Sequence, residues 1–589
     1  MFRIWRSQYS RYGHSPEAEN ELYAETYTAD ETYTDAELKY IADGGFNGIW
    51  LNMLLHNVVF NKAFPEFGLY ARQQQEKLAS LIERAAKYGI KVYLCCQPPR
   101  AVNEWDKAFW EKHADVSGAR DTLSKLWGTK DGHDFSDFIS ICTSLPKVQK
   151  YLEEAFADLS RALPELGGYI LITASEFPAH CCTRQQPREK QCPRCSKRTP
   201  EEVIAELINC VEKGVHSAAP DQAVIAWNWS WRSSANAFPP DIIRRLNGNV
   251  VIMGDAERGG CDKAGTYIDE YAMCYEGPSP IFLEDMAAAE EHKLGTAAKL
   301  QLNVTHELAS VPNIPVPGQL FARAQWVKHS KNCAGYMGCW NFGNAITANT
   351  AAFHFFTTKE CPDKLLDALE CFAERYFPAC NAKMVAQAWK EFGDALEGYP
   401  HCTPWLYMGC VNWALGYFCP PGKMNGKGGR SWQYDVRGDD LSAAFAKEKD
   451  NGGNPNGERR FNDEQVLERL GRISARWSKA LELFEAGLAS SKCRHSEEEL
   501  NTAKVANACF ISACNMIKMY MMKKNGGIAQ GREYLDIQAC ELDNVRSVAD
   551  IVRADRRQGF HSEAQVYMFD AGMLDDKIAK LEDLLKSNK

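Results

Sequence analysis

Residues 146–176 read PKVQKYLEEAFADLSRALPELGGYILITASE, and this stretch holds the unit on which the fold depends. Its first part has apolar residues spaced three and four apart, which is typical of an amphipathic helix. Two glycines follow, and then comes a near-continuous apolar run, which is typical of a strand buried on both faces of a parallel sheet. The stretch therefore predicts a helix, a glycine turn and a parallel strand, in that order.

The same order recurs along the first 345 residues. Eight strand-like apolar runs alternating with helical patterns predict an α/β fold, a (β/α)₈ TIM barrel, over 1–350. A doubly wound parallel sheet is the alternative, but no strand is followed by a GxGxxG or P-loop motif. The eight predicted strands are 2–8, 46–52, 90–96, 168–176, 223–231, 249–255, 299–307 and 335–342.

The pattern changes beyond residue 360, where helical periodicity continues without strands. We therefore expect an all-α C-terminal domain over 360–589. Within it, residues 420–460 are rich in Gly, Asn and charged side chains, which predicts a long polar loop.

Composition limits the function classes. The 589 residues include 68 Lys and Arg against 77 Asp and Glu, a net charge of −9, which gives no electrostatic reason to expect nucleic acid or an anionic membrane as partner. No apolar run approaches the roughly 18 residues of a membrane span, and the first residues lack an apolar stretch of signal-peptide length. The 22 cysteines, in a chain large enough to bury its own core, indicate reduced thiols. We expect a cytoplasmic protein, or a secreted one with its leader removed; homo-oligomerisation stays open.

The predicted strands end in residues suited to one kind of chemistry. In this fold the site lies at the C-terminal ends of the strands, where Glu176 ends the fourth predicted strand and Glu307 the seventh. Cleavage of a glycosidic bond needs one protonated and one ionised carboxyl group. We therefore predict a retaining glycosidase that removes a terminal sugar, with Glu176 as acid/base and Glu307 as nucleophile. A structural pairing with an arginine is the alternative for either glutamate.

Aromatic and polar residues near the same strand ends are candidates for substrate binding, because Trp faces suit the C–H faces of sugar rings. Trp227, Trp229 and Trp231 alternate and would share one side of a strand, although they could also be core. Asp255 and Glu257 are better interpreted as structural. The predicted substrate-binding residues are Arg3, Trp227, Trp229, Asn303, His306 and Trp340.

Two segments carry a resemblance. LITASEFPAH (171–180), with the Cys-rich loop after it, and NVTHELASVPNIPVP (303–317) resemble the family 20 hexosaminidases and their bacterial relatives. Glutamates at the tips of strands four and seven also resemble the large clan of retaining barrel glycoside hydrolases. The resemblance implies the acid role for Glu176. It departs at Ser175, where family 20 enzymes carry the Asp that orients the substrate's acetamido group, and this favours Glu307 as nucleophile.

Four alternatives to this prediction stay open. The first is a substrate-assisted N-acetylhexosaminidase, and the second is an inverting glycosidase, whose two carboxyl groups would lie farther apart. The third is a non-catalytic barrel that only binds carbohydrate, and the fourth is a barrel enzyme that does not act on glycosides.

The loop after Glu176 has metal-ligand spacing. A Cys-x-x-Cys pair preceded by a further Cys about ten residues earlier is typical of a structural zinc site. Four free thiols, or a disulfide, are the alternatives. Three or four thiolates leave a metal no open position, so we expect no cofactor for catalysis. We interpret Cys142 as a packing residue. The predicted ligands are His180, Cys181, Cys192 and Cys195, or Cys182 in place of His180.

Overall fold

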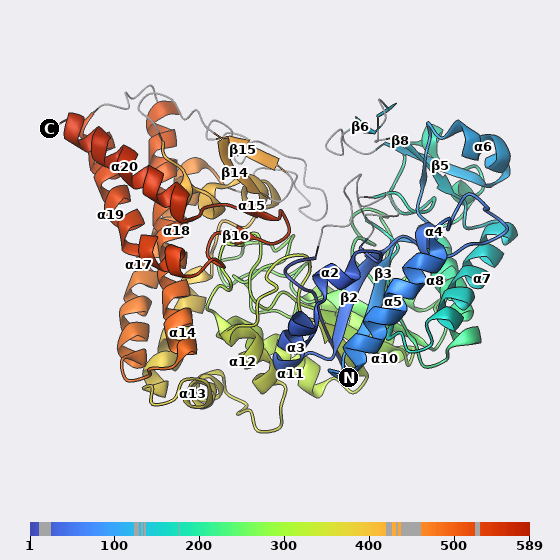
Figure 1. Ribbon diagram of the computed structural model, residues 1–589, viewed down its shortest axis with the longest axis horizontal. Coiled ribbons are helices and arrows are strands. Elements are labelled where there is room, and N and C mark those ends of the chain that lie inside the picture. Colours follow the sequence, from blue (N-terminus) through green and yellow to red (C-terminus); the bar gives the residue numbers. More distant parts are fainter. Residues whose placement is uncertain are drawn as a thin grey trace. The chain divides into compact units, whose positions relative to one another are not determined.

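The computed structural model describes residues 1–10, 25–122, 129–130, 133–134, 137–175, 177–419, 427–431, 434–437, 461–524 and 531–588. Eight parallel strands close into a barrel in the order β1-β13-β12-β11-β10-β9-β3-β2, which confirms the predicted (β/α)₈ barrel. Figure 1 shows the course of the chain and labels the barrel strands β2 and β3. The strands are β1 (Phe2–Trp5), β2 (Gly48–Met53), β3 (Lys91–Cys96), β9 (Gly168–Ile172), β10 (Ala223–Trp227), β11 (Val250–Asp255), β12 (Gly295–Lys299) and β13 (Cys333–Met337).

Two predicted strand boundaries are wrong in a way that affects the site. The seventh strand is β12 at Gly295–Lys299, and the apolar residues 300–307 that follow it form irregular backbone. Glu307 therefore lies eight residues beyond the end of β12 and not at a strand tip. Strand β10 ends at Trp227, so the alternation expected for Trp229 and Trp231 does not apply to them.

Local sequence signals position the strands. Helix α8 begins at Pro200 behind a capping box in which Thr199 and Glu202 satisfy each other's backbone N–H groups. Gly168 begins β9 at a φ of +146°, and a Cβ there would lie 2.1 Å from the Ala223 carbonyl oxygen of β10. Only glycine allows this close strand pairing. The helices between the strands are α2 (Ala29–Thr32), α3 (Asp35–Asp43), α4 (Leu55–Val58), α5 (Ala71–Ala86), α6 (Lys107–His113), α7 (Pro146–Ala162), α8 (Pro200–Ala218), α9 (Pro239–Ile243), α10 (Pro280–Glu291) and α11 (Phe321–His329).

The long connection from β3 to β9 contains a small antiparallel sheet that the sequence did not predict. Its strand order is β4-β8-β5, with β4 at Val102–Asn103, β5 at Ser117–Thr122 and β8 at Asp137–Ile141. A two-stranded pair, β6 (Thr129–Lys130) and β7 (His133–Asp134), lies in the same connection.

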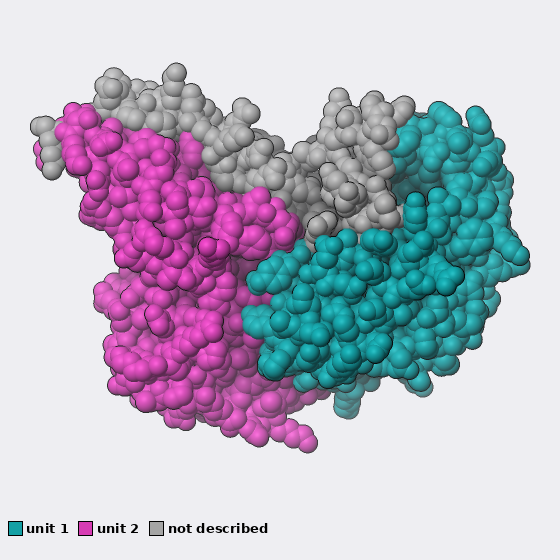
Figure 2. Space-filling model, viewed as in Figure 1, with its two compact units in different colours: residues 1–255, 281–300, 330–338 teal, residues 256–280, 301–329, 339–589 magenta. Residues whose placement is uncertain are grey.

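The chain divides into two compact units (Figure 2). Unit 1 comprises residues 1–255, 281–300 and 330–338, and it holds all eight barrel strands. Unit 2 comprises residues 256–280, 301–329 and 339–589. The segments that follow β11, β12 and β13 along the chain are therefore part of the same compact unit as the C-terminal helices.

Unit 2 is mainly helical, as the sequence predicted. Successive long helices pack in pairs, α14 with α17, α17 with α18, α18 with α19 and α19 with α20. Aromatic rings fill the space between them, with the Phe392 and Trp477 centroids 4.4 Å apart. The remaining helices and strands are α12 (Ala348–Phe356), α13 (Leu365–Tyr376), α14 (Ala382–Leu396), α15 (Thr403–Met408), β14 (Lys427–Ser431), β15 (Tyr434–Arg437), α17 (Asp463–Leu488), α18 (Arg494–Lys524), α19 (Arg532–Ala554), β16 (Phe560–His561), β17 (Val566–Tyr567) and α20 (Ala571–Ser587).

Three sequence expectations concern the chain as a whole. Most of the predicted polar loop at 420–460 lies outside the described residues, apart from the short antiparallel pair β14-β15. None of the helices in the described part of the chain has the length and apolar character needed to cross a membrane. All 22 cysteines carry free thiols.

Candidate functional site

The loop after β9 is fixed at its start. Glu176 itself lies outside the described residues, but its neighbours are well anchored. The carbonyl oxygen of Thr173 lies 2.6 Å from His180 Nε2, and Trp231 Nε1 donates to Thr173 Oγ1 over 2.8 Å. Ser175 Oγ accepts from Gln97 Nε2 at 3.1 Å. Residues on both sides of Glu176 are therefore held by buried hydrogen bonds.

Two of the predicted tryptophans lie at the end of β10 in unit 1. Trp227 is 0% exposed, and its Nε1 donates to Asp255 Oδ1 over 3.1 Å. Trp229 is half-buried, with its ring centroid 5.2 Å from that of Trp227. Trp227 thus packs inside the unit and orients Asp255, whereas Trp229 still presents surface on which a sugar could stack.

Glu307 is 0% exposed and holds a neighbouring loop of unit 2. Its Oε2 accepts from the Met273 backbone N–H at 2.7 Å and from the Thr305 hydroxyl at 2.8 Å, while Oε1 accepts from the Cys274 N–H at 3.2 Å. A nucleophile must turn a carboxylate oxygen toward the sugar, and both oxygens of Glu307 are occupied by backbone donors. This geometry suits an anchoring carboxylate.

Replacing Glu307 with Gln should lower the free energy of unfolding by about 3 kcal/mol. The neutral amide loses charge-assisted hydrogen bonds, each worth about 1.5–3 kcal/mol, and turns an NH₂ group toward backbone N–H donors. Urea unfolding measures the change, with Glu291→Gln as the control because Glu291 is exposed. A stable but inactive Glu307→Gln protein would instead identify Glu307 as a catalytic group.

A second carboxylate of unit 2, Glu270, has different surroundings. It lies in the segment that follows β11, is 7% exposed and forms an ion pair with Arg258. The Tyr407 hydroxyl donates to Glu270 Oε2 over 3.0 Å, and the Tyr271 N–H donates to Oε1 over 3.0 Å. Burial alone would raise the pKa of Glu270, but the charge of Arg258 and the hydrogen bonds from Arg258 and the Tyr271 N–H are among the causes that together hold the pKa below its usual value. Glu270 is therefore an ionised carboxylate.

His306, from the segment that follows β12, packs beside this ion pair. Its ring centroid lies 4.8 Å from that of Tyr407, and its Nε2 lies 3.9 Å from Glu563 Oε2. Glu563 belongs to the turn between β16 and β17, near the C-terminal end of the chain. We refer to Arg258, Glu270, His306, Tyr407 and Glu563 as the His306 cluster. It brings together segments that are far apart in sequence, with two carboxyl groups beside one imidazole.

Burial lowers the pKa of His306 to about 4 and that of its neighbour His561 to about 3. Both are neutral at pH 7, whereas in the unfolded chain they titrate near 6.5. Between those values the unfolded state binds more protons, so their contribution to stability is complete above pH 6.5 and falls as the pH drops. We expect each histidine to lower the free energy of unfolding by about 2 kcal/mol between pH 7 and pH 5. Urea unfolding at both pH values should show a smaller loss for His561→Asn than for the parent; an equal loss would contradict this.

The structure also shows the surroundings of three other predicted binding residues. Asn303 donates to the carbonyl oxygens of Gly343 at 2.8 Å and Ala345 at 2.5 Å, so its amide is occupied in joining two loops. Arg3 lies in the N-terminal half of β1 with an exposed side chain, whereas this fold builds its sites at the C-terminal strand ends. Trp340 is mostly buried, and its backbone N–H donates to Gln301 Oε1 at 2.6 Å.

Glu257 has the structural role that the sequence favoured. Its Oε1 accepts from Arg323 Nη1 at 2.8 Å, and both side chains are 0% exposed. Arg323 also donates to the carbonyl oxygens of Ala272 and Glu276, each at 2.9 Å. This buried pair therefore fixes the segment that carries Glu270.

Comparison with solved structures places this geometry among known folds. A family 138 glycoside hydrolase targeting pectin rhamnogalacturonan II matches with a TM-score of 0.50 and 12% identity, over 100% of this chain and 68% of that one. The chain shares its fold with that enzyme. An O-GlcNAc hydrolase mutant from Thermobaculum terrenum matches with a TM-score of 0.35 and 10% identity, over 94% and 93% of the two chains. Neither a scan against protein-family models nor a search of curated proteins gives a match.

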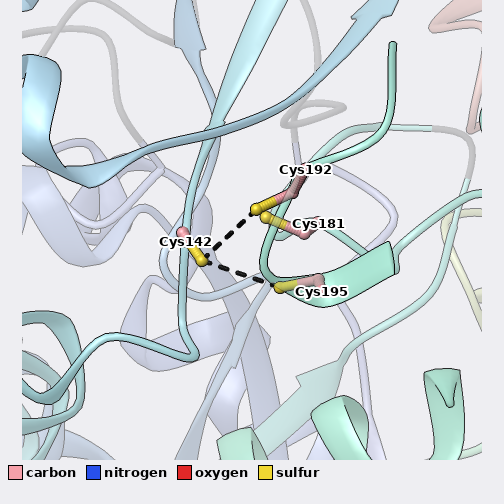
Figure 3. A group of neighbouring side chains, drawn as sticks. All are labelled: Cys142, Cys181, Cys192 and Cys195. Atoms are coloured by element: carbon pink, nitrogen blue, oxygen red, sulfur yellow. Dashed lines mark hydrogen bonds between the residues drawn. The ribbon is translucent and has the colours of Figure 1, made fainter. Parts of the chain in front are cut away.

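The described residues also contain a group of four buried thiols in unit 1 (Figure 3). Cys142 Sγ lies 3.6 Å from Cys195 Sγ and 3.7 Å from Cys192 Sγ, and all four sulfur atoms, including that of Cys181, lie within 4.8 Å of one another. This group could hold a metal ion. It differs from the predicted ligand set, because Cys142 takes the place expected for His180.

Two details explain the correction. Both ring nitrogens of His180 are occupied, Nε2 by the Thr173 carbonyl oxygen and Nδ1 by the Cys182 N–H at 3.3 Å. Cys142 directly follows β8 and was interpreted as a packing residue, because it lies far upstream of the other three in a short apolar run. The position of Cys142 in the sequence therefore did not indicate a metal ligand, whereas the spacing of the Cys-x-x-Cys pair did.

Proposed function

We propose that this chain is a glycoside hydrolase that removes a terminal sugar from a glycan or glycoconjugate. The observation that carries the proposal is the His306 cluster, in which an ionised Glu270 is set between Arg258 and Tyr407. It lies on segments that follow strands of a (β/α)₈ barrel, the fold that builds its active sites from such segments. An ionised carboxylate beside a sugar is one of the two groups that the reaction needs.

The residues divide into roles. Glu176, on the loop after β9, supplies the proton to the leaving oxygen. Glu270 is the better candidate for the ionised carboxylate, since its Oε2 accepts from a side-chain hydroxyl and its charge faces Arg258, whereas both oxygens of Glu307 accept from backbone N–H groups. His306 and Trp340 are proposed to contact the sugar, and Trp229 to stack on its ring.

The proposed mechanism is retaining. A substrate-assisted N-acetylhexosaminidase of the family 20 kind is less favoured, because Ser175 stands where those enzymes have Asp. An inverting enzyme is the other alternative, and proton NMR of the first-formed sugar anomer distinguishes the two outcomes. Binding of glycans without turnover would point to a carbohydrate-binding barrel.

Hydrolysis by two carboxyl groups needs no cofactor. A metal held by four thiolates has no open coordination position for a substrate. We therefore propose that the ion of the four-cysteine group is Zn²⁺ and that its role is structural.

Replacing Glu176 with Gln tests the acid role. Loss of general acid catalysis typically costs 10²–10⁴-fold, and the cost should be largest for substrates with poor leaving groups. We expect kcat/KM to fall about 10³-fold on alkyl glycosides and much less on 2,4-dinitrophenyl glycosides, whose aglycone leaves without a proton. Equal losses on both substrates would contradict the assignment.

A further inference from the structure

We propose that metal binding at Cys142, Cys181, Cys192 and Cys195 clamps the loop after β9 to the small sheet β4-β8-β5 and so holds the segment that bears Glu176. The catalytic consequence rests on the proposed glycosidase function, whereas metal binding and loop order do not. The metal would then help to position the segment that bears Glu176 without itself contacting the substrate.

The sulfur geometry fits a tetrahedral ion. A Zn–S distance of about 2.3 Å gives a tetrahedron whose sulfur–sulfur edges are about 3.8 Å. Two sulfur–sulfur distances in the group, from Cys142 to Cys195 and to Cys192, are 3.6 Å and 3.7 Å, and every pair lies within 4.8 Å. Four free thiols in one buried place also give the site the soft ligands that select zinc.

Donors around the sulfur atoms suit thiolates. The Ala119 N–H donates to Cys181 Sγ over 3.4 Å, and Arg194 Nε donates to Cys142 Sγ over 3.3 Å. Ser144 Oγ lies 3.2 Å from Cys195 Sγ. Such contacts orient metal ligands and offset their negative charge. A Cβ at Gly118 would collide with Cys181 Sγ, so glycine leaves the room that the sulfur occupies.

The loop is held by scattered hydrogen bonds, such as that from the Gln185 N–H to the Ser234 carbonyl oxygen, and contains little regular structure. Its described regular structure between Thr173 and Thr199 consists of two single-turn 3₁₀ helices, Arg188–Lys190 and Cys195–Lys197. The hydrophobic cluster beneath it contains the four cysteines together with only Ala119 and Val203 as fully buried members. A segment with so small a core needs a crosslink to stay ordered, and a bound ion supplies one.

The clamp connects directly to the start of the loop. Cys181 is adjacent to His180, whose Nε2 lies 2.6 Å from the Thr173 carbonyl oxygen at the end of β9. Cys142, in contrast, follows β8 of the small sheet. In sequence, Glu176 lies between Thr173 and His180. The hydrogen bond between these two residues, together with a metal ion at Cys181, would therefore restrain the chain on the C-terminal side of Glu176.

Metal analysis of the full chain tests the site. We expect one zinc per chain by inductively coupled plasma mass spectrometry, and we expect it to be lost in Cys142→Ser and in Cys192→Ser. Cys210→Ser is the matched control, since this buried cysteine lies outside the group, and it should keep the metal. His180→Ala should also keep it. No zinc in the parent after incubation with Zn²⁺, or full zinc in Cys142→Ser, would overturn the site.

Hydrogen exchange of the unmutated protein tests the clamp, which avoids reliance on variants that fail to fold. After zinc is removed with a chelator, protection at 173–199 should fall at least tenfold, while that of α17 and α18 stays unchanged. Re-addition of Zn²⁺ should restore it. Unchanged protection after zinc loss would overturn the clamp even if zinc binds. Neither readout requires glycosidase activity, so failure of the proposed function leaves these results interpretable.

Discussion

The Glu270→Gln protein should lose about 10³-fold in kcat, the size of effect expected when a charge that stabilises the transition state is removed. Glu270 is ionised because the charge of Arg258 and the hydrogen bonds that it accepts are among the causes that together lower its pKa against burial, and Gln keeps the shape of the side chain but not the charge. Initial rates on an aryl glycoside that the parent cleaves measure the loss. The free energy of unfolding should also fall, by about 3 kcal/mol, because the side chains of the Arg258–Glu270 pair are only 19% and 10% exposed and the substitution removes one charge of a mostly buried pair.

Glu276→Gln is the matched control, because Glu276 lies on the same segment and also has an ion pair, with Lys263 at 2.8 Å. This variant should keep nearly full activity. If Glu270→Gln keeps its activity while Glu307→Gln loses it, the nucleophile is Glu307, and its hydrogen bonds to Met273 and Cys274 then position a catalytic group.

Replacing Arg323 with Met should cause a large loss of stability in unit 2. The Arg323–Glu257 pair is 0% exposed on both sides, so removing one partner leaves a buried charge and costs about 3–5 kcal/mol. The substitution also frees the carbonyl oxygens of Ala272 and Glu276. Guanidinium unfolding measures the loss, and activity should fall with it because the Glu270 segment loosens.

Arg375→Met provides the comparison, since the Arg375–Glu360 pair is 50% and 69% exposed and should contribute less than about 1 kcal/mol. The double variant Arg323→Met/Glu257→Gln should recover part of the loss, because the unpaired charge is gone. Similar losses for Arg323→Met and Arg375→Met would contradict a dominant role for the buried pair.

The barrel was predictable because its strands are buried on both faces and helices cover them, which makes them apolar runs in the sequence. The exception is instructive. β12 reads GTAAK, whose small residues give little strand signal, while the following LQLNV looks like a strand and is a loop. The error placed Glu307 at a strand tip. The local sequence pattern therefore locates strands well where large apolar side chains dominate, and poorly where the side chains are small.

The sequence indicated residues of the proposed site only where they lie near a predicted strand. His306 is one of these, and its role in substrate binding stays a prediction. Glu270, Glu563 and Cys142 were missed, because each joins its partners through long-range packing that leaves no spacing in the chain. The Cys-x-x-Cys pair was found because both ligands belong to one turn. Ligands and catalytic groups that converge from separate segments need the fold before they can be recognised.

Hydrolysis of a panel of 4-nitrophenyl glycosides is the measurement that tests the central claim most directly. The parent, Glu176→Gln, Glu270→Gln and Glu276→Gln proteins should be assayed side by side, with zinc content and folding checked for each. The account predicts that the parent and Glu276→Gln cleave one sugar, that Glu270→Gln is nearly inactive and that Glu176→Gln is impaired. Cleavage that is equally fast in all four proteins would contradict it, as would binding of glycans with no turnover by the zinc-loaded parent.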